Sequence, residues 1–183
     1  MDGVTIIPFN GKTPRIDPSA FVAPGCRIIG DVEIGPEASI WYNCVLRGDV
    51  TVIRVGARSN IQDGSVIHCD SGHDGAGGYP TIIGEDVLIG HLAMVHGTTL
   101  HDRSFVGLGG ITMDGTAIHS GGMLAAGGML TPGKTIGANE MWGGRPARLM
   151  RMLTEAQAAA NLMGAAHYRV LAKAHRAAGA ARA

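Results

Sequence analysis

Three of the eight histidines have a spacing that suits a shared metal site. His68 and His96 are 28 residues apart, and His91 precedes His96 by five residues. Three neutral imidazoles with one open position are typical of catalytic zinc. A metal held in this way lowers the pKa of its bound water to about 7, so that hydroxide is available at neutral pH. The alternative is that these are unrelated surface histidines.

Whether these side chains meet depends on the repeat that carries them. An aliphatic residue recurs mostly at every sixth position, and we call this series the ladder. It has 19 positions, of which 18 are Val, Ile or Leu. A period of six fits neither an α-helix nor a simple hairpin meander, but it suits short strands separated by corners, each with one residue pointing into a common core. An ordinary β-sandwich is the alternative, but it needs longer alternating strands. The ladder positions are 22, 28, 34, 40, 46, 52, 55, 61, 67, 83, 89, 95, 100, 106, 112, 118, 124, 130 and 136.

The glycine content supports the same repeat. The chain has 29 glycines in 183 residues, about twice the usual share, and only 4% of its residues are aromatic. Because glycine tolerates a positive φ, we expect the glycines that follow ladder residues to form the sharp corners of a coil. These glycines are Gly35, Gly56, Gly84, Gly90, Gly107 and Gly137.

Residues from about 21 to 136 resemble the hexapeptide-repeat family, and Gly144-Arg145-Pro146-Ala147-Arg148 resembles the segment that leaves the coil in these proteins. The resemblance implies a mainly β fold, a left-handed parallel β-helix of triangular cross-section in which three hexapeptides make one turn. We expect the β-helix over about residues 10–140, within a single domain that covers residues 1–183.

A C-terminal helix is predicted over about residues 154–178. Thr154 and Gln157 have the spacing of a capping box, in which each side chain bonds to the backbone N–H of the other residue. Leu162, Ala166 and Val170 recur at helical spacing, with Met163 beside them. We expect this apolar stripe to pack along one face of the β-helix.

The repeat predicts how the three histidines are placed. His68 and His96 each follow a ladder residue directly, and if the stretch Asp70–Tyr79 bulges out as a ten-residue loop, one full turn of three hexapeptides separates them. Their imidazoles then stack in adjacent coils, about 4.8 Å apart. His91 lies on the preceding side of the triangle, beyond a corner. It would reach the other two histidines from a neighbouring subunit in a threefold trimer.

The three histidines, together with Asn43-Cys44-Val45-Leu46-Arg47-Gly48-Asp49 and Asn60-Ile61-Gln62-Asp63-Gly64, resemble the γ-class carbonic anhydrase family. The resemblance implies a homotrimer with a metal site between subunits, where metal-bound hydroxide hydrates CO2 to bicarbonate. His68 and His96 would come from one subunit and His91 from the next. Zn2+ is the expected metal, and Fe2+ or Co2+ also accepts three imidazoles.

Further roles follow from the same resemblance. Gln62 would hydrogen-bond the metal-bound water or hydroxide, Asn60 would orient Gln62, and Asp63 would lie beside the site. Arg47 and Asp49 correspond to a pair that forms ion pairs between subunits. A polar turn at residues 60–62 and a solvated surface pair at Arg47 and Asp49 are the structural alternatives.

The sequence departs from the family pattern at the proton shuttle. Val50 stands where the archetype carries an acidic shuttle residue. Asp70, His73 and Asp74 lie just after the first ligand and are the substitutes we consider, since histidine titrates near neutral pH. Tyr168 corresponds to a tyrosine that some relatives place near the metal, or else it packs the helix onto the β-helix.

Composition excludes several classes of protein. The chain has 15 basic and 15 acidic residues, so it lacks the excess positive charge on which nucleic-acid and anionic-membrane binding rely. We found neither an apolar run long enough to span a bilayer nor a signal peptide. Three cysteines, Cys26, Cys44 and Cys69, are an odd number without paired spacing and predict free thiols. A cytoplasmic location is therefore expected.

The residues leave other functions open. The same metal site could hydrolyse acyl-CoA thioesters. An acyl-CoA-dependent acyltransferase of the hexapeptide fold would use a histidine as general base and would need no metal-binding trio. A non-catalytic role in a larger assembly is the third class.

Overall fold

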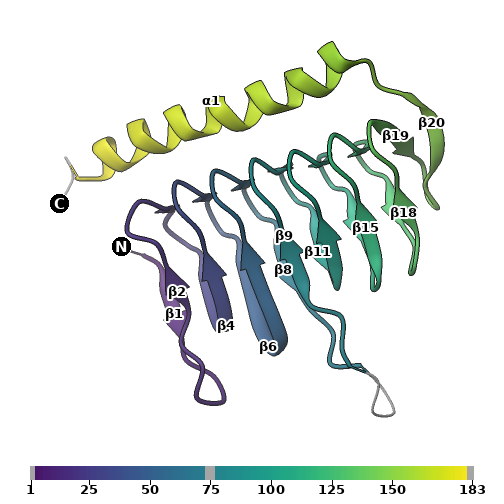
Figure 1. Cartoon of the computed structure of the whole chain (residues 1–183). Helices are drawn as coiled ribbons and strands as arrows, with labels where there is room; N and C mark the ends of the chain where they lie inside the picture. Colours follow the sequence, from purple (N-terminus) through teal and green to yellow (C-terminus); the bar gives the residue numbers. More distant parts are fainter. Residues whose placement is uncertain (1–2, 73–76, 181–183) are drawn as a thin grey trace.

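Short parallel strands stack in successive coils, and one long helix lies along their side (Figure 1). This computed structural model describes residues 3–72 and 77–180. The coils form the parallel β-helix that the family resemblance implied, and they begin with Thr5, earlier than expected. Within the described residues, no helix combines the length and the apolar character needed to cross a bilayer.

The strands form three faces. The helix face, which α1 covers, ends in an antiparallel pair and consists of β3 (Phe21–Val22), β5 (Ser39–Ile40), β7 (Asn60–Ile61), β10 (Leu88–Ile89), β13 (Phe105–Val106), β16 (Met123–Leu124), β19 (Glu140–Gly143) and β20 (Arg148–Met152). The histidine face consists of β1 (Thr5–Ile7), the first halves of β4 (Arg27–Ile34) and β6 (Val45–Val55), β8 (Val66–His68), β11 (Met94–His96), β14 (Ile111–Thr112) and β17 (Met129–Leu130). The third face consists of β2 (Arg15–Ile16), the second halves of β4 and β6, β9 (Thr81–Ile83), β12 (Thr98–Leu100), β15 (Thr116–Ile118) and β18 (Thr135–Ile136).

The ladder residues form the core, with one exception. Every ladder position other than Val52 is buried, whereas Val52 is half-buried and Ile53 takes the core position instead. The reason is an insertion in β6. Ile28 pairs with Leu46, which lies three hexapeptides later in the chain. The same step from Ile34 would reach Val52, but Ile34 pairs with Val55, three residues further on. The three extra residues turn Val52 away from the core.

A second insertion confirms the predicted loop after His68. Val66 pairs with Met94, which is one coil of three hexapeptides plus the ten residues of the loop. The insertion is closed by a backbone hydrogen bond of 2.9 Å from the N–H of Asp70 to the carbonyl of Tyr79. The strands on either side of the insertion therefore keep their register with the neighbouring coils.

The glycines after ladder residues have a different role from the one predicted. None of the six has a positive φ; the positive φ lies two residues later in each case, for example at Leu92 and Asn139. The glycines are instead needed because adjacent coils come very close there. A Cβ at Gly56 would lie 2.3 Å from the carbonyl oxygen of Gly84, and one at Gly107 would lie 2.4 Å from the nitrogen of Ala126.

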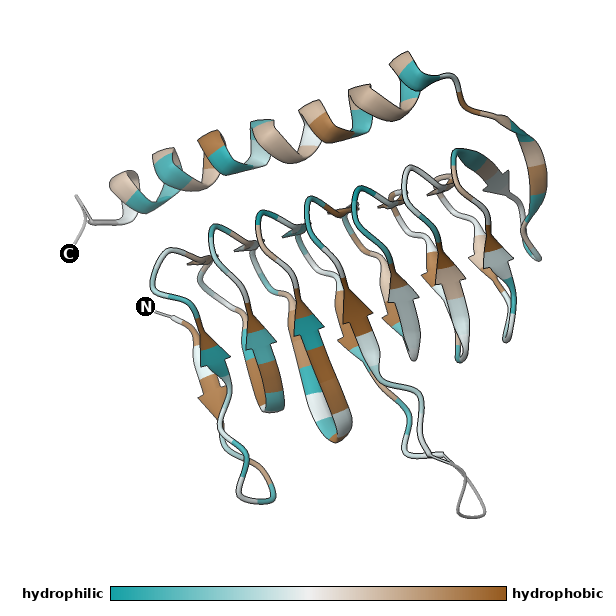
Figure 2. Ribbon diagram, in the orientation of Figure 1, coloured by the Kyte–Doolittle hydropathy of each residue, from teal (hydrophilic) through white to brown (hydrophobic). Residues whose placement is uncertain are grey.

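The helix α1 (Glu155–Ala180) begins with the predicted cap. The backbone N–H of Thr154 donates to Gln157 Oε1 (3.1 Å), and that of Gln157 donates to Thr154 Oγ1 (3.3 Å). The predicted apolar stripe, however, is wrong. Met163 and Val170 are 74% and 66% exposed, and Leu162 is exposed as well. In Figure 2, brown apolar and teal polar segments alternate along the helix.

Small and aromatic side chains form the actual helix contact. Ala172 is buried against Phe21 and Trp41, with Tyr168 at the edge of the same cluster. The rings of Trp41 and Tyr168 meet edge to face, with centroids 5.2 Å apart. Small residues let the helix approach the coil while the rings fill the space between them, which is why the buried side contains alanines.

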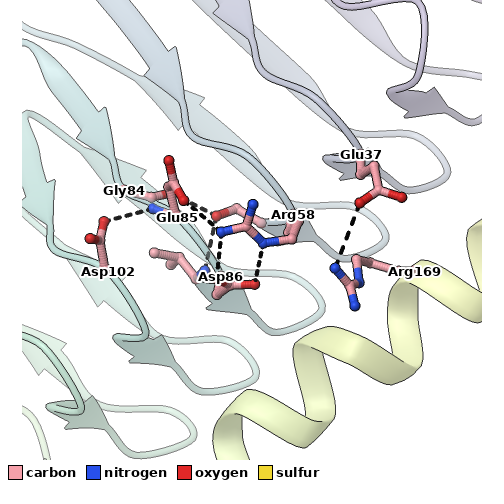
Figure 3. Close-up of polar contacts among 9 residues, drawn as sticks. Glu37, Arg58, Gly84, Glu85, Asp86, Asp102 and Arg169 are labelled. Atoms are coloured by element: carbon pink, nitrogen blue, oxygen red, sulfur yellow. Dashed lines mark hydrogen bonds and ion pairs between the residues drawn. The ribbon is translucent and has the colours of Figure 1, made fainter.

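Charged side chains add contacts at the corners. Arg58 Nη2 lies 2.9 Å from Asp86 Oδ2 in the next coil, and Arg169 Nη1 of the helix lies 3.6 Å from Glu37 Oε2 (Figure 3). Ion pairs this close to solvent contribute at most about 1 kcal/mol each.

Candidate metal centre

His68 and His96 occupy equivalent positions in adjacent coils. They are register partners at the ends of β8 and β11, as the sequence predicted. The ring centroids are 5.0 Å apart, and His68 Nδ1 lies 3.0 Å from His96 Nε2. The β-helix thus brings one nitrogen of each imidazole together on the histidine face.

The outer nitrogen of each imidazole in this pair contacts a carboxylate. Asp49 Oδ1 lies 3.1 Å from His68 Nε2, and Asp114 Oδ1 lies 2.6 Å from His96 Nδ1. A neutral imidazole carries its proton on one nitrogen, and donation to the carboxylates leaves a lone pair on both inner nitrogens. Two lone pairs facing at 3.0 Å repel unless a cation lies between them. Because nitrogen ligands bind zinc at about 2.0–2.1 Å, the donor set fits such a metal.

Burial keeps His68 in the neutral form that a ligand needs. Burial is the main cause that lowers the pKa of His68, and Arg47 acts in the same direction while Asp49 opposes them. Burial acts to raise the pKa of Asp49, but hydrogen bonds from Arg47 and His68 outweigh it, and the net shift is downward. A neutral histidine beside an ionised aspartate is the arrangement that a metal site needs.

Arg47 and Asp49 pair within the chain. Arg47 Nη1 lies 2.6 Å from Asp49 Oδ2, so the carboxylate of Asp49 is shared between Arg47 and His68. The ion pairing between subunits that the family resemblance implied stays a prediction.

His91 belongs to a separate cluster. It follows β10 on the helix face, so a corner separates it from His96, as predicted. Its Nδ1 lies 2.8 Å from Asp63 Oδ2 and its Nε2 lies 3.4 Å from the hydroxyl of Tyr168. Burial, followed by the charge of Asp63, raises the pKa of Tyr168, which keeps the phenol protonated. Among the residues that the structure describes, no group of three or more His, Cys, Asp or Glu side chains in one chain could hold a metal.

Asn60 begins β7 on the helix face, and Gln62 directly follows this strand. Both are buried, and Gln62 Nε2 donates to Asn60 Oδ1 at 3.1 Å. Asn60 Nδ2 has no hydrogen-bond partner in the described part of the chain. The contact through which Asn60 was expected to orient Gln62 is therefore present.

The three proton-shuttle candidates do not form a cluster that the structure describes. Asp70 Oδ1 accepts a hydrogen bond of 2.9 Å from the backbone N–H of Ser71, so its carboxylate caps the start of the loop. His73 and Asp74 lie outside the described residues.

Sequence reasoning missed Asp114. It follows His96 by three hexapeptides, and this spacing is the signal that could have found it. With it, all three predicted ligands have a carboxylate partner. Among the described histidines, no other has a carboxylate oxygen within 4.0 Å of a ring nitrogen.

Known proteins resemble this chain over most of its length. It is 44% identical over 164 residues to the mitochondrial gamma carbonic anhydrase 1 of Arabidopsis thaliana. The aligned region covers 90% of this chain and 60% of the Arabidopsis protein. It is also 42% identical over 150 residues to a carbonic anhydrase of Geobacillus kaustophilus. That aligned region covers 82% of this chain and 79% of the Geobacillus protein. The chain thus spans about three fifths of the length of the plant relative. No family model matches it.

The crystal structure of a hexapeptide transferase family protein from Anaplasma phagocytophilum has the same fold. It superimposes with a TM-score of 0.87 at 44% sequence identity and covers 95% of this chain and 99% of that one. Sequence identity and fold agree with the motifs around the histidines. This chain belongs to the γ-class carbonic anhydrase family of hexapeptide-repeat proteins.

Proposed function

We propose that this protein is a metal-dependent carbonic anhydrase that hydrates CO2 to bicarbonate, with His68, His91 and His96 as ligands. Its carbonic anhydrase relatives imply a metal cofactor. One observation carries the assignment of ligands, namely that each of these three histidines has its own carboxylate partner. Metal-ligating histidines almost always donate their other N–H to a carboxylate, a carbonyl or water. Zn2+ is the proposed metal, with Fe2+ and Co2+ as alternatives.

The side chains around the ligands have distinct tasks in this proposal. When bound, the metal supplies Lewis-acid chemistry and lowers the pKa of a coordinated water to about 7. Gln62, held by Asn60, keeps its second amide N–H and its carbonyl free to orient a reacting oxygen. The protonated hydroxyl of Tyr168 lies next to His91 and can donate a hydrogen bond.

The histidine face supports a homotrimer with sites between subunits. A column of outward-facing apolar side chains runs along it, and Leu92 and Leu108 beside His91 are 73% and 53% exposed. In this column Met94 is exposed and the other four side chains are half-buried, and apolar side chains gathered on one face mark sites of protein association. A second copy on this face would cover the column and supply the missing His91. The column consists of Val45, Val66, Met94, Ile111 and Met129.

Metal analysis combined with two assays tests the proposed reaction. We expect about one metal per subunit, and CO2 hydration that chelation removes and Zn2+ restores. Absence of hydration above an apo control would contradict the proposal. Rapid loss of acyl-CoA thioester would then favour thioester hydrolysis by the same site. Acyl transfer that survives chelation would favour an acyltransferase, the candidate supported by the fold of the hexapeptide transferase relative.

Subunit mixing tests the shared site. His91→Ala and His68→Ala should each abolish metal binding in pure trimers. In a threefold ring, any mixed trimer regains one complete site, so random mixing in equal amounts should restore about a quarter of the sites. Trimers shown by mass spectrometry to be mixed, yet without metal, would mean that the three histidines do not bind across subunits.

A further inference from the structure

Asp114 reaches His96 from the next coil, and nothing in the family resemblance assigns it a role. We propose that Asp114 is a positioning residue of the metal centre, which fixes the orientation and tautomer of His96. This inference rests on the proposed metal site. It adds a residue that neither touches the metal nor was found by motif.

The hydrogen bond between these two side chains determines which nitrogen of His96 faces the site. Asp114 Oδ1 lies 2.6 Å from His96 Nδ1, a short distance typical of bonds to charged acceptors. With the proton on Nδ1, the lone pair is on Nε2, which lies 3.0 Å from His68 Nδ1. Asp114 thus holds the ligand atom of His96 toward its partner.

The local backbone is built to allow this contact. Thr98 and its partner Thr116 are separated by three full hexapeptides. Val95 and its partner Thr112 are separated by one residue fewer, so the coil is one residue shorter at this point. The missing residue falls just after His96, where Gly97 has a φ of +52°. A Cβ at Gly97 would lie 2.2 Å from Asp114 Oδ1. Glycine at position 97 therefore leaves the space through which the carboxylate reaches the imidazole.

The chain offers a matched control for Asp114. Asp102 also lies two residues after a ladder residue, but on another side of the coil. Its Oδ1 accepts a hydrogen bond of 2.8 Å from the backbone N–H of Glu85 (Figure 3), and none of the described histidines is its partner. Asp102→Ala therefore removes the same side chain from the same place in the repeat without touching the site.

Metal affinity of the purified protein, measured by chelator competition with Zn2+, tests the role of Asp114. We expect Asp114→Ala to weaken binding by about 10–100-fold, the usual effect of removing an outer partner of a ligand. Asp114→Asn keeps an acceptor oxygen and should lose less. Asp102→Ala should bind as the wild type does. With Co2+, the visible absorption of Asp114→Ala should change, because the geometry of the ligand set changes.

The outcomes separate this inference from the function on which it rests. Wild-type protein that binds no metal would overturn the metal centre and this inference together. Wild-type protein that binds metal, with Asp114→Ala and Asp102→Ala equally tight, would overturn the role of Asp114 alone. Should Asp114→Ala fail to fold, Asp114→Asn decides: no loss in affinity and an unchanged Co2+ spectrum would count against the proposal.

Discussion

Two stacked histidine pairs lie on different faces of the same coil. His68 and His96 are on the histidine face, and His101 and His119 follow β12 and β15 on the third face. In both pairs each histidine directly follows a buried ladder residue, and the ring centroids are 5.0 Å and 4.7 Å apart. A β-helix therefore stacks imidazoles wherever histidine recurs in register.

The surroundings make the two pairs different. The rings of His101 and His119 are nearly parallel, with an interplanar angle of 9°, whereas those of His68 and His96 are inclined by 54°. Asp49 and Asp114 contact the outer nitrogens of His68 and His96. The residues that lie in register with His101 and His119 in the flanking coils are glycines, Gly84 and Gly137, and within the described residues neither imidazole has a carboxylate partner. Coil geometry brings two histidines together, and the side chains beyond them determine whether the pair is ready for a metal.

The largest effect is expected when each pair is broken. His96→Ala should lose metal altogether, by more than the ~100-fold that an outer partner contributes, because a ligand itself is removed. His101→Ala should keep its full metal content. Elemental analysis of dialysed protein measures both. Equal losses in the two variants would show that His101 and His119, the surface pair, also bind the metal. The two pairs would then not differ in metal binding.

A smaller effect is expected when a glutamate is introduced on the histidine face or on the third face. Met94 and Thr99 both point outward, one residue before a ladder residue, on the histidine face and the third face respectively. Burying a charge costs several kcal/mol, so Met94→Glu should weaken trimer association by about 100-fold.

Thr99→Glu is the control for the charged face and should leave the trimer intact. Light scattering over a dilution series measures both variants. Metal content should fall with the trimer in Met94→Glu, because in the proposed trimer the neighbouring subunit supplies His91. A Met94→Glu trimer as stable as the wild type would place the interface elsewhere.

The smallest expected effect is a gain at the second pair. Gly137→Asp places a carboxylate beside His119, and its Cβ would meet the Glu140 carboxyl carbon at 2.9 Å, which is the end of a side chain that can move. In a His68→Ala background, we expect Ni2+ to bind the surface pair about tenfold more tightly. Titration calorimetry measures the change, with Gly137→Asn as the uncharged control. Equal affinity in the two variants would mean that a neighbouring carboxylate does not distinguish the pairs.

Periodicity predicted much of the fold because it depends on local spacing. The inward ladder follows from counting residues, and the family resemblance supplied the coil of three hexapeptides. Together they predicted the ten-residue loop after His68 and the stacking of His68 on His96. The helix cap at Thr154 was found for the same reason, since both partners lie within one turn.

The errors arose where distant segments meet. The side of α1 that packs is chosen by the rings of Phe21 and Trp41, so Ala172 is buried while the more apolar Val170 faces away from the coil. Val52 fits the period of six but lies in an insertion whose register only the neighbouring coil fixes.

The sequence by itself determined the coil and the placement of the histidines along it, because a six-residue apolar period has to be buried and stacking then follows from residue number. Only the tertiary structure decided which side chains complete the site. Asp49 and Asp114 reach the imidazoles because a three-residue insertion and a one-residue deletion shift the backbone beside them. Such contacts depend on the relative position of separate coils. A spacing of three hexapeptides points to Asp114, but it does not specify that the carboxylate turns toward His96.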